Sequence, residues 1–305
     1  MDTLILDDMP PQEPEHPRKG GIFTDKTREA LANALEHHSS YEIGRLKMIL
    51  ALIWTYRWGY STPTILDLVV GGNGHGNIAS RLLKAGYIER FGIYLGSRFD
   101  ALPRWITVLT PDGVREAEAN VDHLVHHLHR HSGERIQRSN LVHDLRVQRF
   151  TLRNLSGAPF GNSCGHDEGY LFVPRKGVGK VVGFMSPAEL GEVSLGSKLP
   201  DAVWLMPDGK RLAIEVELTA KWGWEFDITL ERTVNLIRND TYQGVLIVTR
   251  SKSIQKRYES AFAGGQPVRR WVKNLERKYV RREDEDSVIE SRVADAISVV
   301  LRSDL

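Results

Sequence analysis

The sequence predicts a mixed protein of the α+β or α/β class, in which short helices and a hairpin precede a mixed sheet flanked by helices. Apolar residues recur at helical spacing between residues 41 and 86, and two strand-like runs follow at 87–93 and 104–110. After residue 133 come a helical stretch, four strand-like runs, a second helical stretch and a last apolar strand. The 305 residues, 41% of them hydrophobic, are enough for two ordinary domains with a core each.

The overall composition excludes several classes of protein. Lys and Arg number 41 against 39 Asp and Glu, a balance that neither demands nor excludes nucleic acid. Cys164 is the only cysteine, which excludes an internal disulfide and a CxxC zinc site and fits a reducing compartment. No charged leader and no apolar run of about 18 residues is present, so we expect neither secretion nor a membrane span, and a cytoplasmic location.

Changes in composition along the chain predict four parts. Prolines and acidic residues near the start predict a disordered or loosely attached tail over residues 1–38. We expect a DNA-binding domain with a linking helix at 39–131, a sheet domain at 132–265, and basic helices at 266–305.

The first part of the chain has the pattern of three helices and a hairpin. Apolar residues recur at helical spacing from Tyr41 to Tyr60, and Thr62 with Pro63 has the residues that start a second helix. A third helix is predicted from Asn77 to Gly86, before the two strand-like runs. This order is typical of a winged helix-turn-helix, whose third helix enters the major groove while its hairpin contacts the backbone.

The winged-helix interpretation identifies candidate DNA contacts. The third helix and the turn before it would present His75, Asn77, Ser80, Arg81 and Lys84, and the wing would present Arg98 and Arg104. A protein-binding module is the alternative, because winged helices also serve that purpose and the basic residues here are sparse.

Two further segments are predicted to be helical. In the histidine-rich segment 121–131, apolar residues recur with a period of 3.6 and predict the linking helix. On such a helix His123, His127 and His131 share one face. This face could hold a metal, but it is more simply explained as a face exposed to solvent. Near the end of the chain, Arg270, Lys273 and Arg277 fall on one helical stripe. This basic stripe could contact DNA phosphates, although ordinary amphipathic helices have the same pattern.

The residues from Lys198 to Lys221 predict a register between two strands. Pro207-Asp208-Gly209 has the residues of a three-residue hairpin loop, which pairs Met206 with Lys210. Counting back along both strands places Asp201 opposite Glu215, about 5 Å apart, with Glu217 on the same face. Three carboxylates gathered in this way either raise one another's pKa or hold a divalent cation, and we favour the cation.

The acidic segment is similar to a known nuclease signature. Pro200-Asp201, a gap of thirteen residues and Glu215-Val216-Glu217 resemble the Pro-Asp…(Asp/Glu)-x-Lys motif of the restriction-endonuclease superfamily. Glu217 stands at the lysine position, so Lys221 is the natural substitute for the missing charge and Lys198 a weaker one. Alternatively, Glu217 becomes an additional metal ligand.

The longer pattern resembles the replication-relaxation family, which includes MOBC-type relaxases of mobilisable plasmids. The likeness covers about residues 46–249 and depends on His143-Asp144-Leu145, on Pro-Asp-Ala at 200–202 and on Glu-x-Glu-Leu-Thr-x-Lys at 215–221. It implies a restriction-endonuclease-like domain that nicks one strand of double-stranded DNA at a plasmid transfer or replication origin, using Mg²⁺ or Mn²⁺.

By position, the resemblance assigns roles to individual residues. It makes Asp201, Glu215 and Glu217 the metal site, Lys221 the source of positive charge, and His143 or Asp144 a catalytic contributor. It implies a nicked or single-stranded product and relaxosome or coupling proteins as partners. The alternative is a catalytically inactive DNA-binding regulator or accessory relaxosome protein, which the missing lysine favours.

Overall fold

A computed structural model describes residues 39–72, 74–93, 105–121, 124–125, 132–136, 139–155, 181, 183–190 and 199–303. The predicted tail at 1–38, the predicted strand at 170–173, the histidines of the 121–131 segment, Arg98, Arg104 and Lys198 lie outside the described residues. Among the helices that the structure describes, none combines the length and apolar character needed to cross a membrane.

The N-terminal helices and the hairpin form in the predicted order. Their bounds are α2 (Ser40–Trp58), α3 (Pro63–Val69), α4 (Asn77–Lys84), β1 (Ile88–Gly92), β2 (Trp105–Leu109) and α5 (Pro111–Glu118). Ser39 and Glu42 form a capping box at the start of α2, and the Thr62 side chain accepts the backbone N–H of Ile65 at the start of α3. These caps explain why both helices begin where the sequence predicts.

The helix predicted at 121–131 is wrong for the residues that the structure describes there. Val121, Leu124 and Val125 belong to no helix. The N–H of Val125 donates to the hydroxyl oxygen of Tyr56 at 3.1 Å, and that hydroxyl donates to the Val125 carbonyl at 3.3 Å. The backbone groups of Val125 are therefore satisfied by a side chain of α2 instead of by helical hydrogen bonds.

A five-stranded mixed sheet forms the second half of the chain. Its order is β11 (Ile297–Leu301), β6 (Gly244–Thr249), β5 (Arg211–Glu217), β4 (Ala202–Leu205) and β3 (Gly183–Met185). The pairs β3–β4 and β4–β5 are antiparallel, whereas β5–β6 and β6–β11 are parallel. Strand β11 was not among the predicted elements of the sheet.

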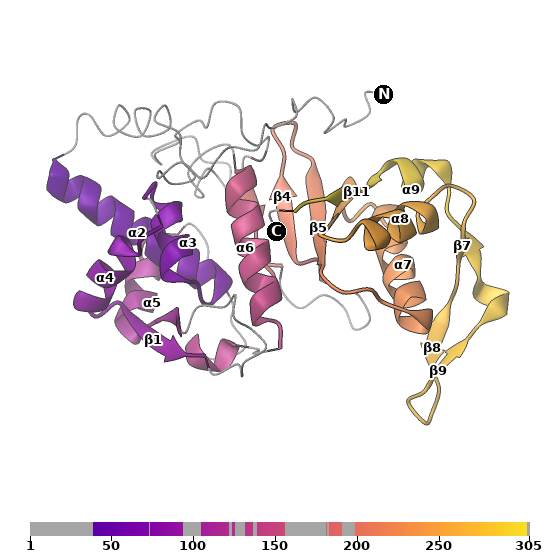
Figure 1. The fold of residues 1–305 in the computed structure, drawn as a ribbon, viewed down its shortest axis with the longest axis horizontal. Helices are drawn as coiled ribbons and strands as arrows, with labels where there is room; N and C mark the ends of the chain where they lie inside the picture. Colours follow the sequence, from indigo (N-terminus) through magenta and orange to yellow (C-terminus); the bar gives the residue numbers. More distant parts are fainter. Residues whose placement is uncertain are drawn as a thin grey trace.

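Helices cover both faces of this sheet. Helix α6 (Leu141–Asn154) lies between the N-terminal helices and the sheet, while α7 (Gly223–Arg238) and α8 (Lys252–Ala261) lie on the other side (Figure 1). The alternation along β5 follows this arrangement, because Ile214 and Val216 belong to the core on the α6 side and Ala213 to the core on the α7 and α8 side. The core on the α6 side continues without interruption into α2, α3 and α4.

The predicted turn and register between β4 and β5 are confirmed. Gly209 has φ of 79°, and the N–H of Met206 donates to the carbonyl of Lys210 at 2.9 Å. The pairing runs from Leu205 opposite Arg211 to Ala202 opposite Ile214. Only glycine takes this positive φ without strain, so the turn chemistry determines the register of both strands.

The basic C-terminal helix predicted from the stripe of Arg270, Lys273 and Arg277 is wrong. An antiparallel hairpin of β8 (Trp271–Lys273) and β9 (Tyr279–Arg281) stands in its place. The turn is closed by Asn274, whose side chain accepts the N–H of Lys278, and Arg277 takes a φ of 61°. Asn favours such turns, and a left-handed residue ends any helix.

Short elements complete the C-terminal region. They are β7 (Pro267–Val268), a 3₁₀ turn η3 (Glu283–Glu285), β10 (Ser287–Val288) and α9 (Ser291–Asp295), and a further 3₁₀ turn η2 (Ser132–Arg135) precedes α6. Strands β7 and β10 pair with each other beside the β8–β9 hairpin. This region carries the chain from α8 to β11, the strand at the edge of the sheet.

Candidate functional site

The predicted acidic residues lie at one end of the sheet, where β5 ends and β4 begins. Glu215 and Glu217 are buried, at 3% and 5% exposed, and occupy alternate positions of β5. They share the side of Ala213, which packs in the core with α7 and α8. Asp201 immediately precedes β4, and its side chain is 16% exposed.

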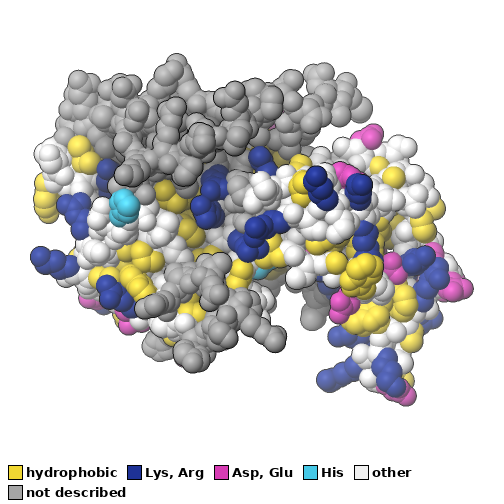
Figure 2. Space-filling model, viewed as in Figure 1, with side chains coloured by type: hydrophobic (Ala, Val, Ile, Leu, Met, Phe, Trp, Pro, Cys, Tyr) yellow, Lys and Arg dark blue, Asp and Glu magenta, His cyan; other side chains and the backbone are white. Residues whose placement is uncertain are grey.

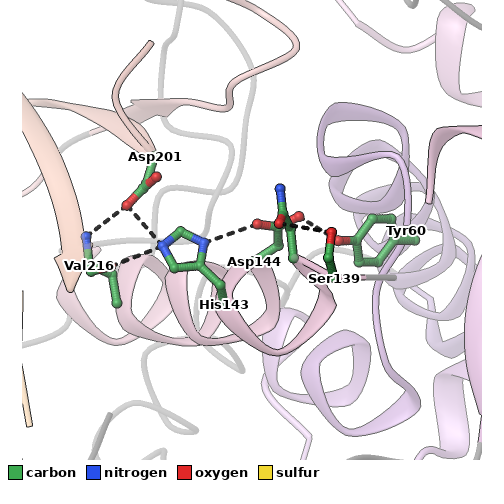
Figure 3. Close-up of polar contacts among 7 residues, drawn as sticks. Tyr60, Ser139, His143, Asp144, Asp201 and Val216 are labelled. Atoms are coloured by element: carbon green, nitrogen blue, oxygen red, sulfur yellow. Dashed lines mark hydrogen bonds and ion pairs between the residues drawn. The ribbon is translucent and has the colours of Figure 1, made fainter. Parts of the chain in front are cut away.

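The Asp201 side chain makes its hydrogen bonds toward the α6 side of this edge. Its Oδ2 accepts the N–H of Val216 at 2.7 Å and lies 3.1 Å from Nε2 of His143 on α6 (Figure 3). The regular pairing of β4 with β5 begins only at the next residue, Ala202, so the alternation of side chains along β4 does not determine where the Asp201 side chain points. In the described part of the chain, no group of three or more His, Cys, Asp or Glu side chains is arranged to hold a metal, so the predicted three-carboxylate cluster is not formed.

His143 lies between two carboxylates and a carbonyl. Its Nδ1 is 3.1 Å from Oδ1 of Asp144, and its Nε2 is 3.0 Å from the carbonyl oxygen of Val216 and 3.1 Å from Oδ2 of Asp201 (Figure 3). All three oxygens are acceptors, so an imidazole that donates from both nitrogens satisfies them best. Burial alone would lower the pKa of His143, but the hydrogen bonds to Asp144 and Asp201 outweigh it and raise the pKa to about 10. His143 is therefore a partly buried imidazolium at neutral pH.

The polar chain continues into the N-terminal helices. The hydroxyl of Tyr60, between α2 and α3, donates to Oδ2 of Asp144 at 2.6 Å (Figure 3). Burial and the charge of Asp144 raise the pKa of Tyr60, which keeps the hydroxyl a neutral donor. Hydrogen bonds thus connect Tyr60, Asp144, His143 and Asp201 to the end of β5. Sequence reasoning missed Tyr60, because 84 residues separate it from Asp144.

A buried network beneath this chain strengthens the same junction. Gln148 of α6 is fully buried and accepts hydrogen bonds from Trp54 Nε1 at 3.1 Å and from Ser61 Oγ at 3.0 Å. Its amide nitrogen donates to the carbonyl of Tyr60 at 2.9 Å. Since buried polar groups are costly to leave without partners, this network holds α6 in one position against the N-terminal helices.

Lys221 lies beside Glu217, on the opposite side of β5 from His143. The two side chains form an ion pair four residues apart in the chain, with Lys221 28% exposed and Glu217 6% exposed at the side chain. Tyr258 of α8 lies near this carboxylate, and burial together with Glu217 raises the pKa of Tyr258. Lys221 therefore balances the charge of Glu217, and its predicted role as the source of positive charge for the reaction stays a prediction.

Two arginines that the sequence analysis did not single out lie near each other, one on α6 and one at the end of β6. Arg146 follows His143 by one turn of α6, and burial together with the charge of Arg250 lowers the pKa of Arg146. Arg250 directly follows β6, whose Thr249 pairs with Glu217. Lys and Arg side chains gather over α6 and the neighbouring sheet (Figure 2). Two neighbouring cations make this edge attractive to an anion such as a phosphate.

The residues predicted to contact DNA from α4 share one exposed surface. His75, Asn77, Ser80, Arg81 and Lys84 are all exposed, whereas Ile78, Ala79 and Leu82 point into the core. Lys47 of α2 lies beside Arg81, and burial together with the charge of Arg81 lowers the pKa of Lys47. The side chain of Asp67 accepts the N–H groups of Gly74 and Ile78, both at 3.1 Å, and so orients the start of α4.

The three predicted DNA contacts at the C-terminal end differ from one another. Arg270 is bound to Glu231 and lies 3.4 Å from Glu285, so its charge is balanced within the protein. Lys273 and Arg277 are exposed on the β8–β9 hairpin. In the hairpin, two of the three predicted contacts, Lys273 and Arg277, are therefore accessible to a ligand.

Comparisons of the whole chain with protein families, with curated proteins and with solved structures find no match. The resemblance to the replication-relaxation family therefore stays a prediction from the sequence.

The polar atoms at the end of β5 fit a divalent cation only in part. Asp201 Oδ2 and the Val216 carbonyl oxygen both lie within 3.1 Å of Nε2 of His143. Two oxygens therefore converge on one positively charged group. Mg²⁺ typically takes one or two protein oxygens and completes its shell with water and substrate phosphate. An ion would bind these two oxygens in place of the His143 Nε2–H that they now accept, and the geometry does not fit the three-carboxylate site that the sequence predicts.

Proposed function

We propose that this protein is a DNA-nicking protein, a relaxase-like endonuclease that uses Mg²⁺ or Mn²⁺. The observation that carries the proposal is the sheet edge at the ends of β4 and β5, where Asp201 lies on the α6 side and Glu215 and Glu217 lie on the other side of β5, in a mixed sheet with helices on both faces. This arrangement is similar to that of restriction-endonuclease-like domains. The activity at a plasmid transfer or replication origin and the relaxosome or coupling proteins as partners rest on the sequence resemblance alone.

The N-terminal helices support the DNA-binding part of the proposal. Three helices followed by the β1–β2 hairpin have the element order of a winged helix, and α4 stands at the position of the recognition helix. Arg81 and Lys84 contribute exposed positive charge, and Asn77 and Ser80 contribute exposed polar groups. This surface is suited to choosing a duplex site.

The side chains at the sheet edge divide the remaining tasks. Asp201 and the Val216 carbonyl would hold the ion, whereas Glu215 lies on the other side of β5. A bound Mg²⁺ or Mn²⁺ would supply a water of lowered pKa and offset charge on the phosphate. Arg146 and Arg250 attract the DNA backbone, and Lys221 balances Glu217 so that the strand end is not too acidic to accept a phosphate.

Nicking of supercoiled DNA tests this function. Wild-type protein with Mg²⁺ or Mn²⁺ is expected to convert a supercoiled plasmid carrying its own origin region into the open circular form, and EDTA should stop the reaction. We expect Asp201→Ala to lower the rate by about 10²–10³-fold, the usual cost of removing a group that supports charge at the reacting atoms. Equal nicking by wild type and Asp201→Ala under both metals would overturn the assignment of the site.

A second candidate is a DNA-binding regulator or accessory relaxosome protein without catalytic activity. It is favoured by the ion pairs at the site, in which His143 contacts Asp201 and Lys221 contacts Glu217, so that protein cations already balance two carboxylates. Retention of specific duplex binding without any nicking would support it. Loss of that binding in Arg81→Glu with Lys84→Glu would then place the function on α4.

A further inference from the structure

Two exposed tryptophans directly follow the acidic strand. Trp222 is 70% exposed and Trp224 is 40% exposed, and both lie within seven residues of Glu217. Tryptophan is usually well buried, because its ring system has a large apolar surface. Exposed tryptophans beside a candidate catalytic edge therefore indicate a ligand that covers them.

Trp224 belongs to a stack that includes the β8–β9 hairpin. Its ring lies 4.4 Å from the ring of Tyr279, with 22° between the planes. The ammonium group of Lys273 is 5.2 Å from the centre of the Tyr279 ring. The hairpin thus places an aromatic ring and an exposed cation against the start of α7, close to the end of β5 in the chain.

Trp222 is combined with a cation in a similar way. The guanidinium of Arg257 lies 4.1 Å from the ring centre of Trp222 and 4.1 Å from that of Phe226. Its Nη1 atom is buried and, in the part of the chain that the structure describes, has no hydrogen-bond partner. Because most of Trp222 stays exposed, Arg257 leaves aromatic surface free for a second stacking partner.

We propose that Trp222, Trp224 and Tyr279, with Arg257 and Lys273 beside them, form an aromatic platform that binds single-stranded nucleic acid. Rings with neighbouring cations suit a strand whose bases stack while its phosphates meet positive charge. A duplex does not offer its base faces for stacking, so it is not expected to occupy the platform. The inference rests on the proposed function, since the strand that reaches the platform is the one released at the end of β5.

Binding of a labelled thymidine oligonucleotide, measured by fluorescence anisotropy without divalent metal, tests the platform. We expect Trp222→Ala and Trp224→Ala each to weaken binding on the order of 10- to 100-fold, which corresponds to the loss of one stacked base. Trp222→Phe should keep most of the affinity, because a smaller ring still stacks. A duplex of the same length should bind these variants as it binds wild type.

Leu275 provides a matched control on the hairpin. This side chain is fully exposed at the tip between β8 and β9, but it is aliphatic and cannot stack on a base. Leu275→Ala should bind the single strand like wild type. If it weakens binding as much as Trp224→Ala does, the contact is a general apolar one, as for a docked protein, and the platform is overturned.

The catalytic variant separates this inference from the proposed function. Asp201→Ala should bind the single strand with wild-type affinity, because the platform lies outside the carboxylate site. Single-strand binding that depends on Trp222, in a protein that never nicks DNA, would refute the proposed function and leave the platform standing. Unchanged binding in a Trp222→Ala, Trp224→Ala double variant that still folds, as measured by circular dichroism, would overturn the platform alone.

Discussion

The two sides of β5 each bring a carboxylate together with a cation, but they do so in different ways. On the α6 side, His143 touches three oxygens from Asp144, Asp201 and Val216, and the chain of contacts continues to Tyr60. On the α8 side, Lys221 makes an ion pair with Glu217 from the segment between β5 and α7. A cation with several fixed acceptors is part of the framework, whereas a lysine on a connecting segment can turn away. The difference predicts that the two carboxylates have unequal roles.

The largest expected effect concerns catalysis. We expect Asp201→Asn to lower nicking by about 10²-fold or more, because it removes the charged oxygen on the side where two oxygens converge. Glu217→Gln should have a much smaller effect, since Lys221 already balances that carboxylate. Single-turnover nicking rates of the two variants under Mn²⁺ check this difference. Equal losses would mean that both sides of β5 serve the chemistry.

The next largest effect concerns stability. His143→Ala leaves Asp144 and Asp201 without their shared cation, which for partly buried groups should cost about 2–4 kcal/mol of unfolding free energy. Lys221→Ala should cost less than His143→Ala, because it removes one contact to the buried Glu217 whereas His143→Ala removes three contacts. Denaturant unfolding followed by circular dichroism measures both. If Lys221→Ala loses more unfolding free energy than His143→Ala, then the Lys221–Glu217 pair, and not the contacts of His143, is the more important for stability.

The pH dependence of stability sharpens the same comparison. The pKa of His143 is about 10 in the folded protein and about 6.5 for an unperturbed histidine, so the folded state binds the proton more tightly. The stability that His143 contributes is therefore complete below pH 6.5 and is lost as the pH rises toward 10. We expect the denaturant concentration at the unfolding midpoint of wild type to decrease as the pH is raised from 6.5 to 9.5. The same decrease in a His143→Asn variant would show that another group is responsible.

A further effect, smaller than that of His143→Ala, is expected at Tyr60, between α2 and α3. Tyr60→Phe removes one hydrogen bond to the charged Asp144 and should cost about 1–2 kcal/mol, without changing the affinity of α4 for duplex DNA. Thermal unfolding and duplex binding of this variant check both statements. If the affinity for duplex DNA also falls, Tyr60 connects the N-terminal helices to the site functionally as well as structurally.

Some of these features were predictable from the sequence, and others were not. Local rules suffice for the turn at Gly209, so the β4–β5 register is confirmed. The direction of the Asp201 side chain was not predictable, because the regular register begins only at Ala202 and the β alternation does not extend to Asp201. The contact between His143 and Val216, 73 residues apart, depends on where α6 packs, which no local pattern determines.

The C-terminal region shows a different limit of sequence reasoning. Basic residues three and four positions apart predict a helix, but the segment contains a turn closed by the side chain of Asn274 and folds into a hairpin. Tertiary contacts such as the stacking of Tyr279 on Trp224 then stabilise the strands. The segment that joins the sheet as β11 was missed for the same reason, since its partner β6 lies far away in the sequence.

Binding of Mn²⁺ tests most directly whether Asp201 and Glu217, on the two sides of β5, have unequal roles. Calorimetric titration of wild type, Asp201→Ala and Glu217→Gln in the absence of DNA compares the two carboxylates on the same protein. We predict that wild type and Glu217→Gln each bind Mn²⁺, and that Asp201→Ala does not. Unchanged binding in Asp201→Ala, or a loss confined to Glu217→Gln, would contradict an ion site on the α6 side of β5.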